Sequence, residues 1–179
     1  MASKLLPASY RCGRILDIGC GSYPFFLLTT RFSEKYGLDR FPMEKKEEYF
    51  QRHQIRLISL DIEKEGPIPF EDEYFDVVTM LAVFEHIDPK RLPNILAEIY
   101  RILKFGGIYI MTTPTAWTDN LLKLLAKLRL VSPVEIEEHK SAYNHDQLRS
   151  LFQNANFAKE RLRFGYFEMF MNIWAVATK

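Results

Sequence analysis

A glycine-rich segment near the N-terminus has the residue types and spacing needed to hold a nucleotide-like ligand. The apolar run Ile15–Ile18 contains Asp17, the spaced glycines Gly19 and Gly21 follow, and Pro24 then opens a helix-compatible stretch. Such a loop lets the main chain approach a ligand closely, because glycine has no Cβ to keep it away. Asp17 can accept hydrogen bonds from a bound group or brace the loop. The segment therefore predicts a cofactor-binding site.

Loops of this kind bind two classes of cofactor, and the spacing of the glycines can be compared with the sequence pattern of each class. The nicotinamide pattern Gly-x-Gly-x-x-Gly, counted from Gly19, places Pro24 at the third glycine. The adenosylmethionine pattern Asp/Glu-x-Gly-x-Gly-x-Gly places Tyr23 at its last glycine, but it also accounts for Asp17. Asp39 follows Gly19 by 20 residues, which suits a ribose-binding carboxylate in either class. Segments further along the chain must therefore distinguish between the two classes of cofactor.

Four later segments favour the second class. Asp61-Ile62 follows an expected strand, where a carboxylate can meet an adenine amino group and an apolar neighbour can cover the ring. Residues 74–78, 83–87 and 98–107 then follow in order as Tyr-Phe-Asp-Val-Val, Val-Phe-Glu-His-Ile and Glu-Ile-Tyr-Arg-Ile-Leu-Lys-Phe-Gly-Gly. Over residues 14–113 this set resembles the class I S-adenosylmethionine-dependent methyltransferases. It is most similar to the small-molecule branch typified by ubiquinone and menaquinone biosynthesis methyltransferases.

The resemblance implies roles for individual positions. The glycine segment lines the methionine and ribose end of the cofactor, and the acidic residue after the second strand binds the ribose hydroxyls. The pair after the third strand holds the adenine, and the pair at the end of the fourth borders the sulfonium. With their neighbours, these predicted cofactor-binding residues are Asp17, Gly19, Cys20, Gly21, Asp39, Arg40, Asp61, Ile62, Leu81 and Ala82.

Three positions depart from the family pattern. Tyr23 replaces a glycine, Phe105 stands where proline is usual, and Asn156 stands before Phe157 in place of glycine. Of these, Tyr23 bears most on function, because its side chain either crowds the cofactor or forms a wall of the acceptor pocket.

No catalytic residue is identified from the sequence alone, but His139, His86 and Tyr23 are candidates. Glu85-His86 is either an acid–base pair or, as we favour, a cap of the turn after the fourth strand. His139 suits a base and an anchor of the loop before the last helix equally well. The four histidines are scattered without ligand-like spacing, so no metal site is expected.

A mostly parallel sheet must position these residues, because apolar runs alternate with amphipathic stretches along the chain. Strands are expected over residues 14–18, 35–38, 55–60, 75–81, 107–112, 159–164 and 170–178. The last two should pair antiparallel through a turn at Gly165 and Tyr166. Helices are expected over 24–33, 88–103 with Gly106 as the stop, and 144–155 with Asn144 and Gln147 as a capping box.

These elements predict one α/β domain over residues 1–179: a Rossmann-like, seven-stranded, mostly parallel sheet with helices on both faces and, as the resemblance implies, an antiparallel last strand. Residues 1–13 form a short N-terminal extension. Residues 114–139 form a helical insertion or lid. Its amphipathic stretch 117–130 either packs on the domain, covers a hydrophobic acceptor as a mobile lid, or contacts a membrane surface.

Composition narrows the choice of partners and compartment. Lys and Arg number 24 against 23 Asp and Glu, so no overall field attracts nucleic acid or an anionic membrane. Residues 80–83 lack the Asn/Asp-Pro-Pro-Tyr motif of amino methyltransferases acting on DNA, which favours a small organic acceptor. No segment has the length of a membrane span or the pattern of a signal peptide, and Cys20 lies where a disulfide would distort the glycine turn. We expect a cytoplasmic monomer or homodimer without stable membrane insertion.

The sequence thus predicts an S-adenosylmethionine-dependent methyltransferase acting on a small organic acceptor. One alternative is a non-catalytic module that keeps the S-adenosylmethionine pocket as a sensor or partner surface. Another is an NAD-dependent oxidoreductase, against which Pro24 at the third glycine counts.

Overall fold

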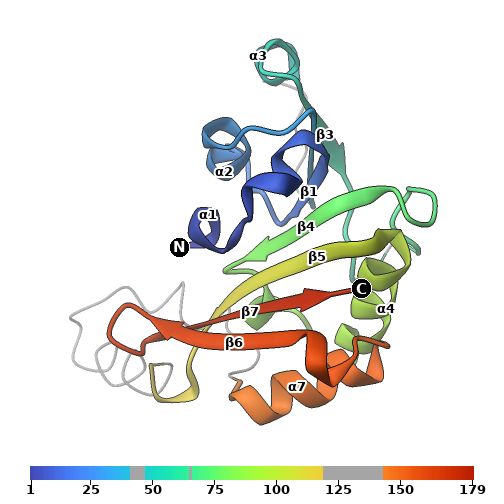
Figure 1. Cartoon of the computed structure of the whole chain (residues 1–179). Coiled ribbons are helices and arrows are strands. Elements are labelled where there is room, and N and C mark those ends of the chain that lie inside the picture. The colour runs from blue at the N-terminus through green and yellow to red at the C-terminus, as the bar shows by residue number, and fades with distance from the viewer. Residues whose placement is uncertain (41–46, 65, 119–142) are drawn as a thin grey trace.

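The computed structural model describes residues 1–40, 47–64, 66–118 and 143–179, and within them the chain forms one mixed sheet of seven strands. The strands are β1 (Arg14–Ile18), β2 (Glu34–Asp39), β3 (Ile55–Ser59), β4 (Phe75–Leu81), β5 (Leu103–Pro114), β6 (Leu162–Phe167) and β7 (Asn172–Thr178). Their order in the sheet is β3-β2-β1-β4-β5-β7-β6 (Figure 1). Strands β1 to β5 are parallel, whereas β7 runs antiparallel to both β5 and β6. The predicted fold class is confirmed.

Helices cover both faces of the sheet. The described helices are α1 (Ala2–Leu5), α2 (Phe25–Thr29), α3 (Glu47–Arg52), α4 (Leu92–Ile102) and α7 (His145–Asn154). Helices α1, α2 and α3 lie on one face of the sheet and α4 and α7 on the other (Figure 1). Apolar residues of the first group belong to one core cluster, and those of the second group belong to the other. Within the described parts of the chain, no helix combines the length and apolarity needed to cross a membrane.

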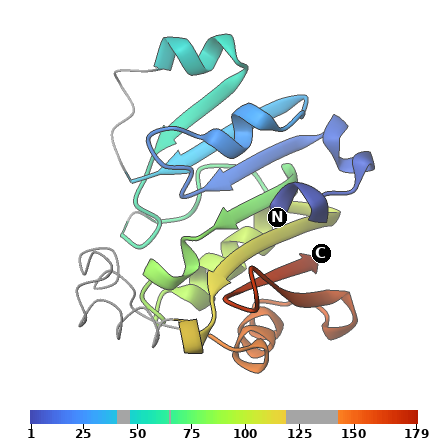
Figure 2. The same ribbon diagram turned by 90° about the vertical axis from the view of Figure 1, so that its left-hand side faces the viewer.

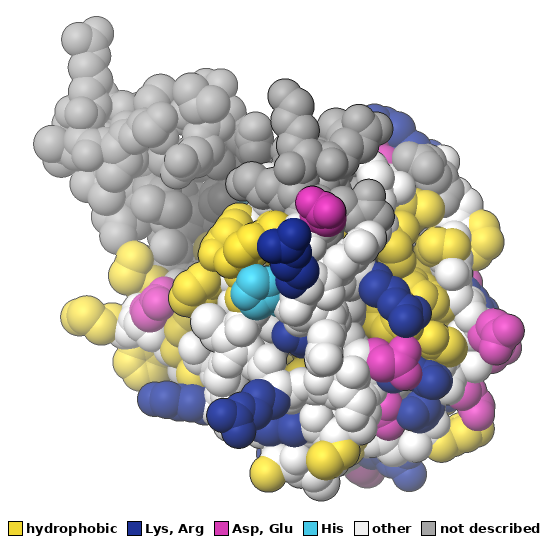
Figure 3. Space-filling model, turned by 90° about the horizontal axis from the view of Figure 1, so that it is seen from above, with side chains coloured by type: hydrophobic (Ala, Val, Ile, Leu, Met, Phe, Trp, Pro, Cys, Tyr) yellow, Lys and Arg dark blue, Asp and Glu magenta, His cyan; other side chains and the backbone are white. Residues whose placement is uncertain are grey.

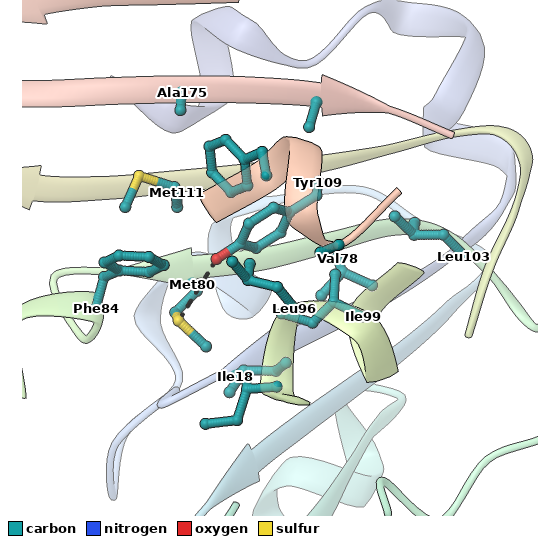
Figure 4. Packing of buried hydrophobic residues seen from close by; sticks show 14 of the residues in the cluster. Ile18, Val78, Met80, Phe84, Leu96, Ile99, Leu103, Tyr109, Met111 and Ala175 are labelled. Carbon is teal, nitrogen blue, oxygen red and sulfur yellow. Dashed lines mark hydrogen bonds between the residues drawn. The ribbon is translucent and has the colours of Figure 1, made fainter. Parts of the chain in front are cut away.

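The core lies on both sides of the parallel strands. Ile15 of β1 belongs to the cluster beneath α2, while Leu16 and Ile18 belong to the cluster beneath α4. This double burial explains why β1 reads as a nearly continuous apolar run. On the α4 side, Tyr109 of β5 is fully buried and its hydroxyl donates to the sulfur of Met80 at 3.5 Å (Figure 4). The core thereby fixes β1, β4 and β5 against one another.

The structure corrects the expected turn between the last two strands. Gly165 and Tyr166 lie inside β6, where they pair with Trp174 and Ile173 of β7. The chain instead reverses between β6 and β7, where the N–H of Met171 donates to the carbonyl oxygen of Glu168 at 3.0 Å. A Cβ at position 165 would collide with the indole ring of Trp174. The glycine therefore permits close packing across the strand pair and does not mark the turn.

Long-range pairing also moves the start of β5. The strand was expected from residue 107, but it begins at Leu103, immediately after α4 ends at Ile102. Leu103 pairs with Phe75 of β4, so its main chain is extended four residues before the expected position. Gly106 lies within β5 with a φ of +77° and its N–H donates to the carbonyl oxygen of Lys179 at 3.0 Å. Gly106 is thus part of β5 and does not stop the helix.

The capping box of the last helix is confirmed. The side-chain oxygen of Asn144 accepts from the N–H of Gln147 at 2.9 Å, and the side chain of Gln147 accepts from the N–H of Asn144 at 2.9 Å. We expect Asn144→Ala to lower the free energy of unfolding by about 1 kcal/mol, because main-chain donors of the first turn lose their acceptor. Urea denaturation measures the change, and Gln153→Ala on the exposed face of the same helix serves as the control. Equal effects of the two substitutions would contradict the capping role.

The expected insertion over 114–139 is described only in its first residues. Thr115, Trp117 and Thr118 hold the tip of the β6–β7 pair, since their side chains donate to the carbonyl oxygens of Phe170 and Met171. The rest of the predicted helix or lid, from residue 119 on, lies outside the described residues.

Candidate functional site

A cleft of about 290 Å³ opens at the carboxyl ends of the parallel strands. The chain order in the sheet reverses at β1, whose neighbours are β2 on one side and β4 on the other. In open α/β sheets, ligands bind in the crevice outside such a switch point. The strands that end there point the same way, while β7 runs opposite (Figure 2). The cleft is lined by Ile18, Gly19, Gly21, Leu38, Asp39, Arg40, Leu60, Asp61, Ile62, Glu63, Val83, His86 and Ile87.

The glycine loop forms the floor of the cleft at the end of β1. Gly19 and Gly21 both adopt left-handed conformations, with φ values of +73° and +69°. The N–H of Gly19 donates to the carbonyl oxygen of Leu38 in β2 at 2.7 Å. A Cβ on Gly19 would lie 2.9 Å from one methyl of Val83 and closer still to the other, whereas a Cβ on Gly21 would meet nothing within 4 Å. Gly19 is thus required by both conformation and packing, and Gly21 by conformation alone.

Asp39 closes the loop from the end of β2. Its side chain is almost fully buried, and its Oδ2 accepts a hydrogen bond from the N–H of Gly21 at 2.8 Å. The predicted ribose-binding carboxylate and the predicted glycine loop are therefore in direct contact on the cleft wall, although 18 residues separate them along the chain.

Asp17 lies beneath the loop, and the structure does not include it among the lining residues of the cleft. Its Oδ1 accepts from the hydroxyl of Thr79 on β4 at 2.6 Å. Burial raises the pKa of the Asp17 carboxyl to about 7; the Thr79 hydrogen bond opposes this rise and the negative charge of Asp39 adds to it. The hydrogen bond with Thr79 ties β1 to β4 directly before the glycine loop begins.

Two further carboxylates line the wall beyond β3. Asp61 accepts from the N–H of Glu63 at 3.0 Å and pairs with Lys64 at 3.0 Å. The hydrogen bond from Lys64 holds the pKa of the Asp61 carboxyl below its usual value. Glu63 accepts from the N–H of Asp88 at 2.7 Å, which ties the segment after β3 to the start of the α4 region. The sequence pattern pointed to Asp61, and Glu63 is an additional carboxylate that the structure places on this wall.

The other predicted cofactor-binding residues divide into two groups. Arg40 and Ile62 line the cleft. Cys20, Leu81 and Ala82 do not appear among its described lining residues. Cys20 sits half-buried within the loop, its sulfur facing Gly37 of β2, and burial raises the pKa of its thiol.

The three candidate catalytic residues are placed very differently. His86 lines the cleft. Tyr23 is half-exposed beside the loop, and its ring meets that of Phe50 edge-on at 6.0 Å, outside the described lining of the cleft. His139 lies outside the described residues. Within those residues, no group of three or more His, Cys, Asp or Glu side chains could hold a metal ion.

Sequence reasoning missed the apolar wall of the cleft. Val83 and Ile87 flank the Glu85-His86 pair of the motif. Leu38 and Leu60 stand next to the acidic residues at the end of β2 and after β3. A usable signal was present, because the last apolar residue of a parallel strand and the first residues after it meet at one edge of the sheet.

The chain matches proteins of known family. A family model described as a methyltransferase domain matches residues 2–162. The curated tRNA N(3)-methylcytidine methyltransferase Mettl2 of Drosophila melanogaster is 22% identical over 167 residues, covering 83% of this chain and 50% of that protein. The chain therefore spans about half the length of this curated relative.

Solved structures share the fold. A possible exported protein from Bordetella parapertussis superposes with a TM-score of 0.73 at 20% identity, covering 98% of this chain and 65% of that one. A SAM-dependent methyltransferase from Archaeoglobus fulgidus gives 0.68 at 18% identity, with 99% and 90% covered. A possible histamine N-methyltransferase from Thermotoga maritima gives 0.69 at 23%, with 99% and 84% covered. At these identities the likeness establishes the fold.

Proposed function

The chain belongs to the methyltransferase-domain family that its residues 2–162 match, and we propose that the cleft at the ends of β1, β2 and β3 is the S-adenosylmethionine site of this enzyme. S-adenosylmethionine is its cofactor. The observation that carries the proposed location is the hydrogen bond between the Asp39 carboxylate and the N–H of Gly21, which joins two cofactor-binding motifs in one wall.

The residues present fit this cofactor. The left-handed Gly19 and Gly21 leave a main-chain cradle without side chains. The described lining carries three carboxylates, Asp39, Asp61 and Glu63, against the single guanidinium of Arg40. An acidic wall complements a ligand that bears sulfonium and ammonium charges.

Each part of the cleft has a role in holding the cofactor. Asp39 would accept hydrogen bonds from the ribose hydroxyls, as carboxylates at the end of a second strand do for nucleotides. Ile62 and Leu60 offer apolar surface to the adenine, with Asp61 and Glu63 beside it. When bound, S-adenosylmethionine supplies an activated methyl group on a sulfonium. The chain must then hold the acceptor in line, which is worth roughly 7–11 kcal/mol of the barrier.

We propose a small organic molecule as the acceptor. The net charge of the chain is +1, and the face in Figure 3 mixes basic, acidic and hydrophobic side chains without a field of one sign. Nucleic-acid binding ordinarily requires a basic surface. His86, on the cleft wall, is the described candidate for a base where the acceptor needs one.

A tRNA base is the second candidate acceptor, since the curated Mettl2 relative acts on tRNA. Incubation with radiolabelled S-adenosylmethionine, a metabolite extract and bulk tRNA separates the two. We expect label in a low-molecular-mass product that chromatography separates from the unreacted S-adenosylmethionine. Label in tRNA alone would show that tRNA is the acceptor in place of a small molecule. The proposed cofactor site would be unaffected by that result.

Asp39→Ala tests the cofactor site. We expect the affinity for S-adenosylmethionine to fall at least about tenfold, equivalent to 1.4 kcal/mol, because charge-assisted hydrogen bonds are lost. Titration calorimetry measures the affinity, and circular dichroism shows whether the variant is folded. Asp72→Ala removes an exposed carboxylate that pairs with Arg101 away from the cleft, and it should bind as the unmodified protein does. Unchanged affinity in a folded Asp39→Ala variant would place the ribose elsewhere.

A further inference from the structure

The turn that follows β4 is held in a strained conformation by β5. Ala82 has a φ of +55°, in the left-handed region that favours glycine. Its N–H donates both to the carbonyl oxygen and to the hydroxyl of Thr112, each at 3.1 Å. Strained residues of this kind persist where their surroundings over-determine them, and they cluster at functional sites.

The far end of the same turn is held by the next residue of β5. Glu85 lies in a short 3-10 helix, Phe84–His86, and only 3% of its surface is exposed. The hydroxyl of Thr113 donates to Oε2 of Glu85 at 3.1 Å, between two residues 28 positions apart. A buried carboxylate requires such donors, because an unsatisfied one is costly. The adjacent residues Thr112 and Thr113 therefore hold the turn by hydrogen bonds at its start and at its end.

The turn between these two hydrogen bonds forms one wall of the cleft. Val83 lies between Ala82 and Glu85, and its methyl groups pack so closely on Gly19 that no Cβ fits there. His86 follows Glu85 directly and also lines the cleft. Val83 and His86 therefore belong to the same short segment that the two contacts join to β5.

We propose that Thr112, Thr113 and Glu85 are positioning residues for cofactor binding, acting through Val83 and His86 without touching the cofactor themselves. This inference rests on the proposed location of S-adenosylmethionine in the cleft. In this proposal Glu85 has a structural role in the Glu85-His86 motif. The hydroxyls of Thr112 and Thr113 contribute to cofactor binding as well as to the stability of β5.

Thr113→Val is the central test, because it keeps the shape of the side chain and removes the donor to Glu85. We expect the dissociation constant for S-adenosylmethionine, measured by titration calorimetry, to rise about tenfold, as for the loss of one hydrogen bond to a charged group. Thr113→Ser restores the hydroxyl and should bring the constant back to within about twofold of the unmodified protein.

A matched control separates positioning from general stability. Thr115, two residues further along, is also buried, and its hydroxyl donates to the carbonyl oxygens of Phe170 and Met171 at 3.2 and 3.1 Å, on the β6–β7 pair. Thr115→Val should lower the melting temperature to a similar degree and leave the dissociation constant unchanged. If Thr113→Val does not fold, Thr112→Val decides, because it keeps the main-chain acceptor for Ala82 and should weaken binding about threefold.

The outcomes are distinguishable. An unmodified protein that does not bind S-adenosylmethionine, or binds it equally well as Asp39→Ala, overturns the proposed site and this inference with it. If the site stands, three results overturn the inference alone: a folded Thr113→Val variant that binds as the unmodified protein, a Thr113→Ser variant that remains weak, or a Thr115→Val variant that binds as poorly as Thr113→Val.

Discussion

We expect Gly19→Ala to lower the free energy of unfolding by about 3 kcal/mol and to abolish cofactor binding. A left-handed conformation costs a residue with a Cβ roughly 1–2 kcal/mol, and overpacking a close contact costs roughly 1–3 kcal/mol more. Both penalties apply at Gly19, where φ is +73° and the added Cβ would meet Val83. Urea denaturation and titration with S-adenosylmethionine measure the two effects.

Gly21→Ala is the matched control. Its φ of +69° is nearly the same, but nothing lies within 4 Å of an added Cβ. Only the conformational penalty applies, so the free energy of unfolding should fall by about 1 kcal/mol. Equal losses at the two glycines would mean that Val83 moves aside freely, and the close packing of the turn on the loop would then have no energetic weight.

We expect Asp17→Asn to stabilise the protein at pH 8 by up to about 4 kcal/mol, which is the free-energy equivalent of a pKa raised from 3.8 to about 7. Between about pH 4 and pH 7 the folded state holds a proton on Asp17 that the unfolded state has lost. The free energy of unfolding of the unmodified protein therefore declines as the pH rises from about 4 towards 7. Above pH 7 the destabilisation by the buried, charged carboxylate is complete. Asparagine carries no charge and its side-chain oxygen still accepts from Thr79. The stability of the Asp17→Asn variant therefore does not decline over this pH range.

Urea denaturation of both proteins at pH 5 and pH 8 tests the prediction. The advantage of Asp17→Asn should be large at pH 8 and small at pH 5. Asp146→Asn replaces an exposed carboxylate on α7 that pairs with Arg149, and its effect should differ little between the two pH values. An advantage of Asp17→Asn that is constant with pH would show that the carboxyl of Asp17 titrates normally in the folded protein.

Local patterns were enough to predict much of this structure. The bounds of β1 and β4 agree with the expected strands, because strands buried on both faces read as unbroken apolar runs. The capping box at Asn144 was readable because its two partners lie three residues apart. The glycine loop and Asp39 were recognisable by spacing alone, and the structure brings them into contact.

Elements defined by distant partners were predicted less well. The start of β5 at Leu103 follows from its pairing with Phe75, and the position of Gly165 follows from the ring of Trp174. Neither partner is near in sequence, so neither could be inferred from local propensity. The burial of Asp17 under the loop has the same origin, since β4 supplies Thr79 as its partner.

The sequence by itself indicated the methyltransferase family and the positions along the chain of the glycine loop and of the strands on either side of it, since these depend on residue types at short, regular spacings. Only the tertiary structure decided which side chains line the cleft and which stand behind it. Ala82 meets Thr112 across 30 residues, and Glu85 meets Thr113 across 28. Hydrogen bonds over such separations leave no periodic trace in the chain, because they depend on how β4 and β5 lie side by side.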